Sequence, residues 1–384
     1  MKNKHLVLTI LVAVVTLGLM WLPFAFKTKS FWGIDFNGRN MQTIVSNFDG
    51  INFLVVAKSL YNPRQIEVDF ASILSGRQNL YFSAHYPGFP LVIKFFDLFV
   101  SGPNALLLSI VVSNILLAWA LYEFFSLFIE NKKWLVTLCT IALFVPARML
   151  SMRIVGSNES LFIFFVLTSL IANYKEKHLL AAIMGGFAVL TRSPGILLYG
   201  AYMLGPLIQF VKTKKIDWKY LATYLIIPAS LVGLWAYYGI VFGDYLAYFK
   251  VGGNINLYFP PFMIFGSHFD WVSGMWLEDV IYTYIFYTAG IYLFFKNIVT
   301  LNPKLKAIGY FGAIYMTMIF FVVHRDISRY ALPIAPIVLA GFSPYLQSKY
   351  TKYILMVLAI PIMLYSWNFI LNNVQPVMDW SKLL

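Results

Sequence analysis

The sequence predicts an all-α polytopic membrane protein, and three observations support this prediction. Of the 384 residues, 60% are hydrophobic and 12% are charged, and the mean hydropathy is +0.73. A soluble domain of this length has no interior large enough for so much apolar surface, so lipid must solvate part of it. The apolar runs lack the alternation of barrel strands, which favours helices. We expect residues 1–384 to form a single transmembrane unit of about eleven helices.

The predicted spans are long apolar runs joined by short polar turns. The first follows Met-Lys-Asn-Lys and is interpreted as a retained anchor, because it is long for a signal peptide and has no small-residue cleavage site. The eleven spans are expected at 5–26, 103–129, 134–150, 158–174, 178–192, 194–211, 219–241, 278–295, 306–323, 329–347 and 352–371.

Two longer segments, 27–102 and 242–277, are predicted to be extracytoplasmic loops. The first contains "INFLVVAKSLY" and "GFPLVIKFFDLFV", which are too short for a crossing of about 20 residues. We expect each to form a helix that lies along the membrane interface. The second loop is rich in Gly, Pro, Tyr and Trp, a composition typical of loops that cover ligands. Anchoring at the membrane interface is the alternative interpretation.

Most of the lysines and all of the arginines are predicted to lie on opposite sides of the membrane. With a cytoplasmic N-terminus, the inner turns collect fifteen lysines and no arginine, which follows the positive-inside rule. This distribution explains the net charge of +13 better than a nucleic-acid partner does. All eight arginines are predicted outside: Arg39, Arg64, Arg77, Arg148, Arg153, Arg192, Arg325 and Arg329.

The outer arginines indicate an anion site. A guanidinium group binds phosphate through two parallel hydrogen bonds, whereas lysine acts as a point charge. Only 34 residues separate Lys177 from Lys212, fewer than two full crossings need, so Arg192 should lie below the outer surface. Recessed charges require a water-filled cavity or protein around them. The alternatives for any one arginine are snorkelling to lipid headgroups and pairing with a local acid.

Five short segments, in this order, resemble the GT-C superfamily of membrane glycosyltransferases, and within it the PIG-V-like mannosyltransferase branch. They are "FDGINFLVVAKSLY", "YFSAHYPGFPLV", "GSNESLFIFF", "AVLTRSPGILL" and "SRYALPIAP". Two features depart from that branch: Phe48 stands where tryptophan is common, and "HYPG" is also similar to a turn of protein-mannosyltransferase and aminoarabinose-transferase relatives.

The resemblance implies transfer of a sugar from a polyprenyl or dolichyl phosphate to a hydroxyl acceptor on the extracytoplasmic face, with mannose as the first candidate for the sugar. The acceptor would be a glycolipid, a glycan or a protein, with membrane lipids as the surroundings. Short inner loops favour a prokaryotic plasma membrane over the endoplasmic reticulum. No cofactor is implied beyond the lipid-linked donor. The sequence contains no Gly-rich phosphate loop and no Asp-x-Asp pair, the motifs that would indicate a nucleotide-sugar donor.

Inverting transfer needs a base for the acceptor proton and positive charge at the departing phosphate. Asp49 is the candidate base, by its position and by the resemblance, and Gly50 would let the backbone approach a ligand. A simple N-cap role for Asp49 is the alternative. Arg192 and Arg329 are the first candidates for the donor phosphate, followed by Arg325 and Arg153.

Four further residues are expected to contact the sugar or the acceptor: Glu159, His85, Tyr86 and His324. Glu159 could equally orient an arginine or cap a helix beside Asn158, and Asp326 could neutralise the nearby arginines. We expect no metal site, because the H-x-x-x-H and Glu-x-x-His spacings are absent.

Two other functions fit parts of the pattern. A transporter or flippase of lipid-linked sugars would also use recessed arginines, but it should show paired inverted repeats, and none stands out. A purely structural membrane subunit would not need so many charged outer turns.

Overall fold

Helices make up nearly all of the regular structure. The computed structural model describes residues 2–74, 78–215, 217–251, 257–266, 272–377 and 379–384. Within these ranges the only sheet is a short antiparallel hairpin of β1 (Ser30–Phe31) and β2 (Ile34–Asp35). The all-α prediction is therefore confirmed, as a lipid-solvated chain of this composition requires. Arg77 and parts of the 242–277 loop lie outside the described residues.

Several helices are long and apolar enough to cross a bilayer, so the chain is an integral membrane protein. They are α1 (Lys2–Ala25), α7 (Gly102–Phe125), η2 (Ser193–Ile196) with α12 (Leu197–Thr213), α13 (Trp218–Tyr224) with α14 (Ile226–Phe242), and α20 (Thr351–Leu371). A sixth span exists if α8 (Lys132–Phe144) and α9 (Ala147–Arg153), bent by 76°, count as one.

The predicted number of about eleven spans is not confirmed among the described residues. Four of the helices at predicted spans are shorter than the roughly 20 residues that a crossing needs. They are α10 (Glu159–Tyr174), α11 (His178–Thr191), α17 (Lys306–Phe320) and α19 (Ala335–Leu346). The longer α16 (Gly274–Phe294) includes Glu278, Asp279 and four tyrosines, so its apolar character is weaker.

The two helices predicted to lie along the interface behave differently. In α3 (Gly50–Ser59), nine of the ten residues are buried, so protein rather than lipid covers this helix. It packs against α6 (Gly88–Asp97) and α7, which corrects the prediction that its apolar surface faces the membrane. In α6, Phe89 and Ile93 are buried, while Leu91 and Phe95 remain exposed. An exposed apolar stripe of this kind is typical of an interfacial helix.

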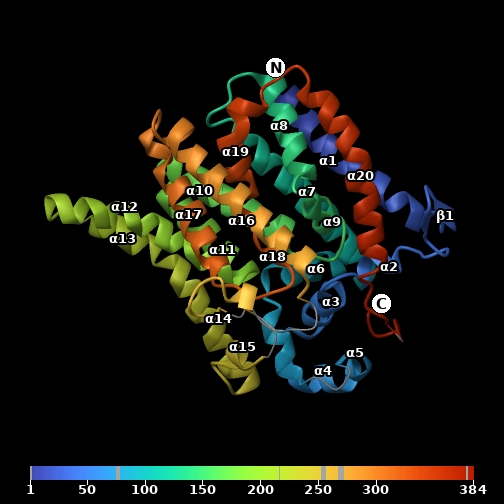
Figure 1. Ribbon diagram of the computed structural model, residues 1–384. Coiled ribbons are helices and arrows are strands. Elements are labelled where there is room, and N and C mark those ends of the chain that lie inside the picture. Colours follow the sequence, from blue (N-terminus) through green and yellow to red (C-terminus); the bar gives the residue numbers. More distant parts are fainter. Residues whose placement is uncertain (1, 75–77, 216, 252–256, 267–271, 378) are drawn as a thin grey trace.

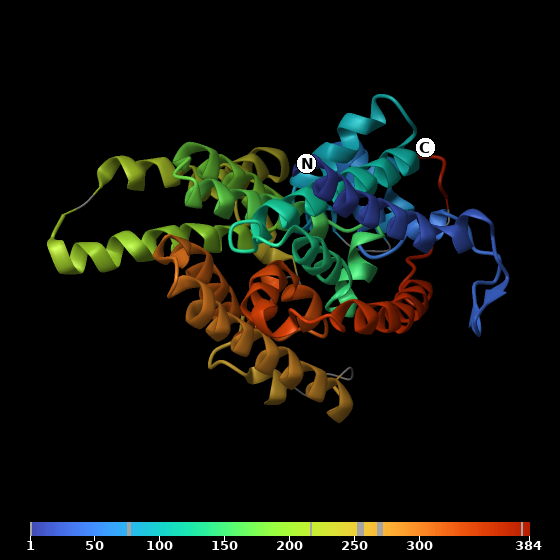
Figure 2. The same cartoon turned by 90° about the horizontal axis from the view of Figure 1, so that it is seen from above.

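Short elements connect and cover the bundle. In Figure 1, α4 (Pro63–Asp69), α5 (Ala71–Leu74) and α15 (Ala247–Lys250) lie at the bottom of the molecule, whereas α12 and α13 project to one side. Figure 2 shows the β1–β2 hairpin at the opposite end of the molecule from α12 and α13. The remaining elements are α2 (Gln42–Val45), α4 (Pro63–Asp69), α5 (Ala71–Leu74), η1 (Asn79–Ala84), α15 (Ala247–Lys250), η3 (Met263–Gly266), η4 (Phe295–Val299), η5 (Pro303–Leu305), α18 (Ile327–Tyr330) and η6 (Leu332–Ile334).

A close backbone contact sets the position of the loop before α3. A Cβ on Gly50 would collide with the carbonyl of Val45 and lie 3.3 Å from the Cα of Gly156. Gly50 therefore allows the backbone to approach another protein segment, and not a ligand as predicted. This contact joins the start of α3 to the turn between α9 and α10.

Candidate functional site

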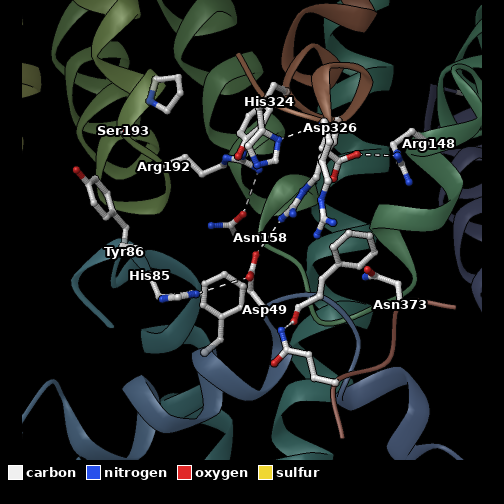
Figure 3. Close-up of a pocket in the computed structure, with 18 of the residues that line it drawn as sticks. Asp49, His85, Tyr86, Arg148, Asn158, Arg192, Ser193, His324, Asp326 and Asn373 are labelled. Atoms are coloured by element: carbon white, nitrogen blue, oxygen red, sulfur yellow. Dashed lines mark hydrogen bonds and ion pairs between the residues drawn. The ribbon is translucent and has the colours of Figure 1, made fainter. Parts of the chain in front are cut away.

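A polar cavity of about 810 Å³ opens where five distant segments meet. Figure 3 shows side chains pointing into it from the start of α3, the turn before α6, the α11–η2 junction, the turn before α18 and the end of α20. Residues from these segments line it together with Arg148 on α9 and Asn158 before α10. Of the nine predicted site residues, seven line this cavity: Asp49, His85, Tyr86, Arg192, His324, Arg325 and Arg329.

Asp49 occupies the N-cap position of α3, but its carboxylate makes no capping hydrogen bond. Its Oδ2 instead accepts a hydrogen bond from Arg329 Nη2 at 3.0 Å, and its Oδ1 lies 3.6 Å from His85 Nε2. The side chain keeps 30% of its surface exposed to the cavity. The capping alternative therefore does not describe this residue, whose carboxylate faces the polar cavity.

The residue before Asp49 has an unusual backbone. Phe48 has a φ of +51°, a left-handed conformation that non-glycine residues seldom adopt. The carbonyl of Phe48 accepts a hydrogen bond from Gln375 Nε2 at 2.5 Å, and its ring stacks on Phe369 at 5.4 Å. The Phe48 ring also contacts Arg329, whose guanidinium carbon lies 4.9 Å from the ring centroid. These contacts hold a strained turn and aim Asp49 at the cavity.

Arg329 and Arg192 share one buried acid. Arg329 Nε donates to Glu159 Oε1 at 2.5 Å, and Arg192 Nη1 donates to the same oxygen. Arg192 Nη1 also lies 3.4 Å from Asn158 Oδ1. The two arginines thus form a continuous chain from Glu159 to Asp49, in which Arg329 bridges both carboxylates. Such charge-assisted bonds fix the orientation of the guanidinium groups.

Glu159 does not line the cavity, because its side chain is 1% exposed beneath the two arginines. The predicted contact between Glu159 and a sugar is therefore corrected. The geometry favours the alternative, in which Glu159 orients the two arginines. Asn158 makes no capping hydrogen bond, and its Nδ2 donates to the carbonyl of Thr191 at 2.9 Å. Asn158 thereby ties the start of α10 to the junction that carries Arg192.

Arg325 and Arg153 have opposite surroundings. Arg325 is exposed in the turn before α18 and lines the cavity with Arg329, and the described residues offer its guanidinium no acidic partner. Asp326, the alternative partner considered for these arginines, pairs with Arg148 Nη2 at 2.6 Å. Arg153 is 1% exposed and does not reach the cavity. Its guanidinium donates to the carbonyls of Leu143 and Ala13 and to Asn114 Oδ1, so its predicted phosphate contact is corrected.

His85 and Tyr86 lie on one wall of the cavity, and His324 lies on another. His85 and Tyr86 follow η1, and the Tyr86 ring meets Tyr248 edge-on at 5.2 Å. His324 Nδ1 accepts a hydrogen bond from the backbone N–H of Asp326 at 3.0 Å. Burial lowers the pKa of His324 to about 4, with nearby Arg329, Arg325 and Arg192 acting in the same direction and Asp326 opposing them. His324 is therefore neutral near pH 7.

Two opposing effects set the acidity of Asp49. Burial by itself would raise the pKa of this carboxyl, but His85 and the guanidinium of Arg329 outweigh burial and hold the pKa well below its ordinary value. Asp49 is therefore ionised throughout the physiological range. Its basicity would increase if Arg329 turned to another anion. Among the described residues, no group of three or more His, Cys, Asp or Glu side chains is placed to hold a metal.

Sequence reasoning missed part of the cavity wall. Arg148 was counted as an outer arginine but not as a site residue, and its guanidinium carbon lies 3.9 Å from the Phe369 ring centroid. Nothing in the sequence of the segment after α20 indicated that it belongs to the site, apart from its position behind the last predicted span. It returns to the Asp49 turn, where Asn373 Nδ2 and Gln375 N donate to Asn47 Oδ1 and the Ser46 carbonyl.

The chemistry of the cavity follows from these groups. Among the described residues, four arginines and two carboxylates line it, Glu159 lies beneath two of the arginines, and a partly exposed Asp49 faces the open volume. The arrangement can bind an anion and accept a proton at adjacent positions. Comparison of the sequence with protein-family models and with curated proteins finds no match.

Proposed function

We propose that the protein is a membrane glycosyltransferase that moves a sugar from a polyprenyl phosphate to a hydroxyl acceptor with inversion. Mannose is the first candidate for this sugar. The observation that carries this proposal is the ion-pair chain from Asp49 through Arg329 to Glu159 and Arg192 at one cavity. It unites a carboxylate and two guanidinium groups from three segments far apart in the sequence.

In the proposed reaction, the acceptor oxygen attacks the anomeric carbon while the bond from that carbon to the donor phosphate breaks. The acceptor proton passes to Asp49, and the bonding electrons leave with the polyprenyl phosphate, which gains one negative charge. Arg329 and Arg192 would stabilise that charge as it develops. Arg325, exposed at the mouth, would attract the anionic donor.

His85, Tyr86 and His324 are the proposed contacts for the sugar and the acceptor. His324 is neutral and presents an uncharged ring to a hydroxyl group, whereas His85 lies beside Asp49. Glu159 would act through the arginines that it holds in place. The proposed location is a prokaryotic plasma membrane with the cavity on the extracytoplasmic side.

The test uses purified protein, polyprenyl-phosphate mannose and a set of glycolipid acceptors. Asp49→Asn should lower transfer by about 10²- to 10⁴-fold, the range for loss of a general base. Asp97→Asn is the matched control, because Asp97 pairs with Lys58 on α3 and does not line the cavity. Full activity of Asp49→Asn would remove Asp49 from the role of base. Donor binding without transfer to any acceptor would favour the transporter or flippase.

A further inference from the structure

A second hollow, almost entirely apolar, lies between α1 and α20. It holds about 420 Å³ and is lined on the α1 side by Leu19, Leu22 and Phe26, and on the α20 side by Ile360, Met363 and Leu364. Leu22, Phe26 and Ile360 are 44%, 77% and 45% exposed, so the groove opens outward. We call this hollow the α1–α20 groove.

The groove exists because α1 and α20 share a neighbour. Both helices pack against α8, and they lie near each other in Figure 1. They meet at Trp367, whose Nε1 donates to the carbonyl of Met20 at 3.0 Å. Trp367 therefore contributes an apolar wall whose one polar atom is already satisfied. The groove offers burial to an apolar chain and no unpaired polar group from this residue.

Shared lining residues connect the α1–α20 groove with the polar cavity. A smaller hollow of about 360 Å³ shares Leu364 with the groove and shares Phe369 and Asn372 with the cavity. Ile360, Leu364, Asn368 and Asn372 follow one another every four residues, so they lie along one face of α20. Along this face the side chains change from apolar to amide as they approach the arginines.

We infer that the α1–α20 groove holds the isoprenoid chain of a polyprenyl phosphate whose phosphate lies at Arg329 and Arg192. This inference rests on the proposed lipid-phosphate donor. The change in polarity along α20 matches an amphiphile with an anionic head and one apolar tail. Branched isoprene units would pack against Phe31, Trp32 and Trp367.

Binding of polyprenyl phosphates of different chain length tests the inference without requiring transfer. The wild-type protein should bind a C55 phosphate at least about tenfold more tightly than a C10 phosphate. Leu364→Trp, at the residue shared by the two hollows, should remove this preference and leave C10 binding unchanged. Leu22→Trp provides a second variant at the groove rim. Ile240→Trp is the matched control, because Ile240 is 81% exposed on α14.

The outcomes separate the groove from the proposed function. If both tryptophan variants fold and keep the C55 preference, the groove assignment is wrong while the donor proposal stands. If neither phosphate binds, the donor proposal fails and the groove assignment fails with it. A C55 phosphate with a photoreactive tail should label peptides containing 19–26 and 360–367. Labelling confined to other helices, or abolished by excess phosphatidylglycerol, would overturn the assignment.

Discussion

Arg153 and Arg329 both bury a guanidinium group, but their partners differ. Arg153 lies between α1, α7 and α8 and donates to two main-chain carbonyls and to an amide oxygen. Arg329 lies at the cavity wall and donates to two carboxylates, one of which is partly exposed. The partners of Arg153 are fixed parts of helices, so no ligand can replace them. A phosphate can compete with Asp49 for Arg329, because both are anions on an accessible surface.

The comparison shows that burial alone does not identify a functional arginine. A guanidinium that satisfies main-chain oxygens joins helices, whereas one that bridges exchangeable carboxylates can bind a substrate. The predictions below test this distinction, from the largest expected effect to the smallest.

Arg153→Met should destabilise the fold by about 3 kcal/mol or more, because it leaves buried oxygens of three segments without a donor. Thermal unfolding in detergent and the yield of monodisperse protein measure the effect. Any fraction that folds should bind polyprenyl phosphate as the wild type does. Weakened binding by well-folded Arg153→Met would show that the two arginine regions are not distinct.

Arg329→Gln should have the opposite effect to Arg153→Met, with weaker ligand binding and a smaller loss of stability. Loss of a charged donor to phosphate is expected to weaken binding of polyprenyl phosphate by about 10- to 100-fold. Glu159 keeps Arg192 as a partner, so the loss of stability should be smaller than for Arg153→Met. Titration of the lipid into detergent-solubilised protein gives the affinity. Unchanged affinity would exclude Arg329 from the phosphate site.

The pH dependence of stability should report His324. Its pKa is lowered from 6.5 to about 4, so the unfolded chain binds more protons than the folded protein between these values. The free energy of unfolding should therefore fall by about 2 kcal/mol as the pH decreases from 7 to 4.5. Asp49 contributes little in this window, because its ordinary pKa of 3.8 and its lowered pKa in the folded protein both lie below pH 4.5.

His324→Gln supplies the control for this measurement. The variant should show a flatter dependence of the unfolding midpoint on pH over the same window. An equally steep dependence would assign the titration to another group.

Asp49→Asn should bind polyprenyl phosphate more tightly than the wild type even though it loses transfer. The substitution removes the anion that competes for Arg329, and we expect a gain of about three- to tenfold. The same titration measures it. Weaker binding would mean that Asp49 holds Arg329 in position for the ligand and does not compete with it.

Most of the candidate site could be predicted from the sequence, because its residues belong to types with few other uses in an apolar chain. Asp49, Arg192 and Arg329 stood out as charges beside short hydrophobic runs. The failures have separate causes. Arg153 has the same sequence character as Arg192, and only its neighbours distinguish the two. The helices α10, α11, α17 and α19 have the hydropathy of spans but are shorter than a full crossing.

The sequence by itself determined the helical membrane class and the grouping of fifteen lysines in turns that hold no arginine, because both follow from composition and local order. Only the tertiary structure decided that Glu159 lies beneath the arginines, that α3 is covered by protein, and that the segment 372–375 closes on the Asp49 turn. Such contacts join separate segments, from Glu159 and Arg192, which are 33 positions apart, to Phe48 and Gln375, which are 327 positions apart. They depend on how helices pack, and no local pattern in the chain encodes that packing.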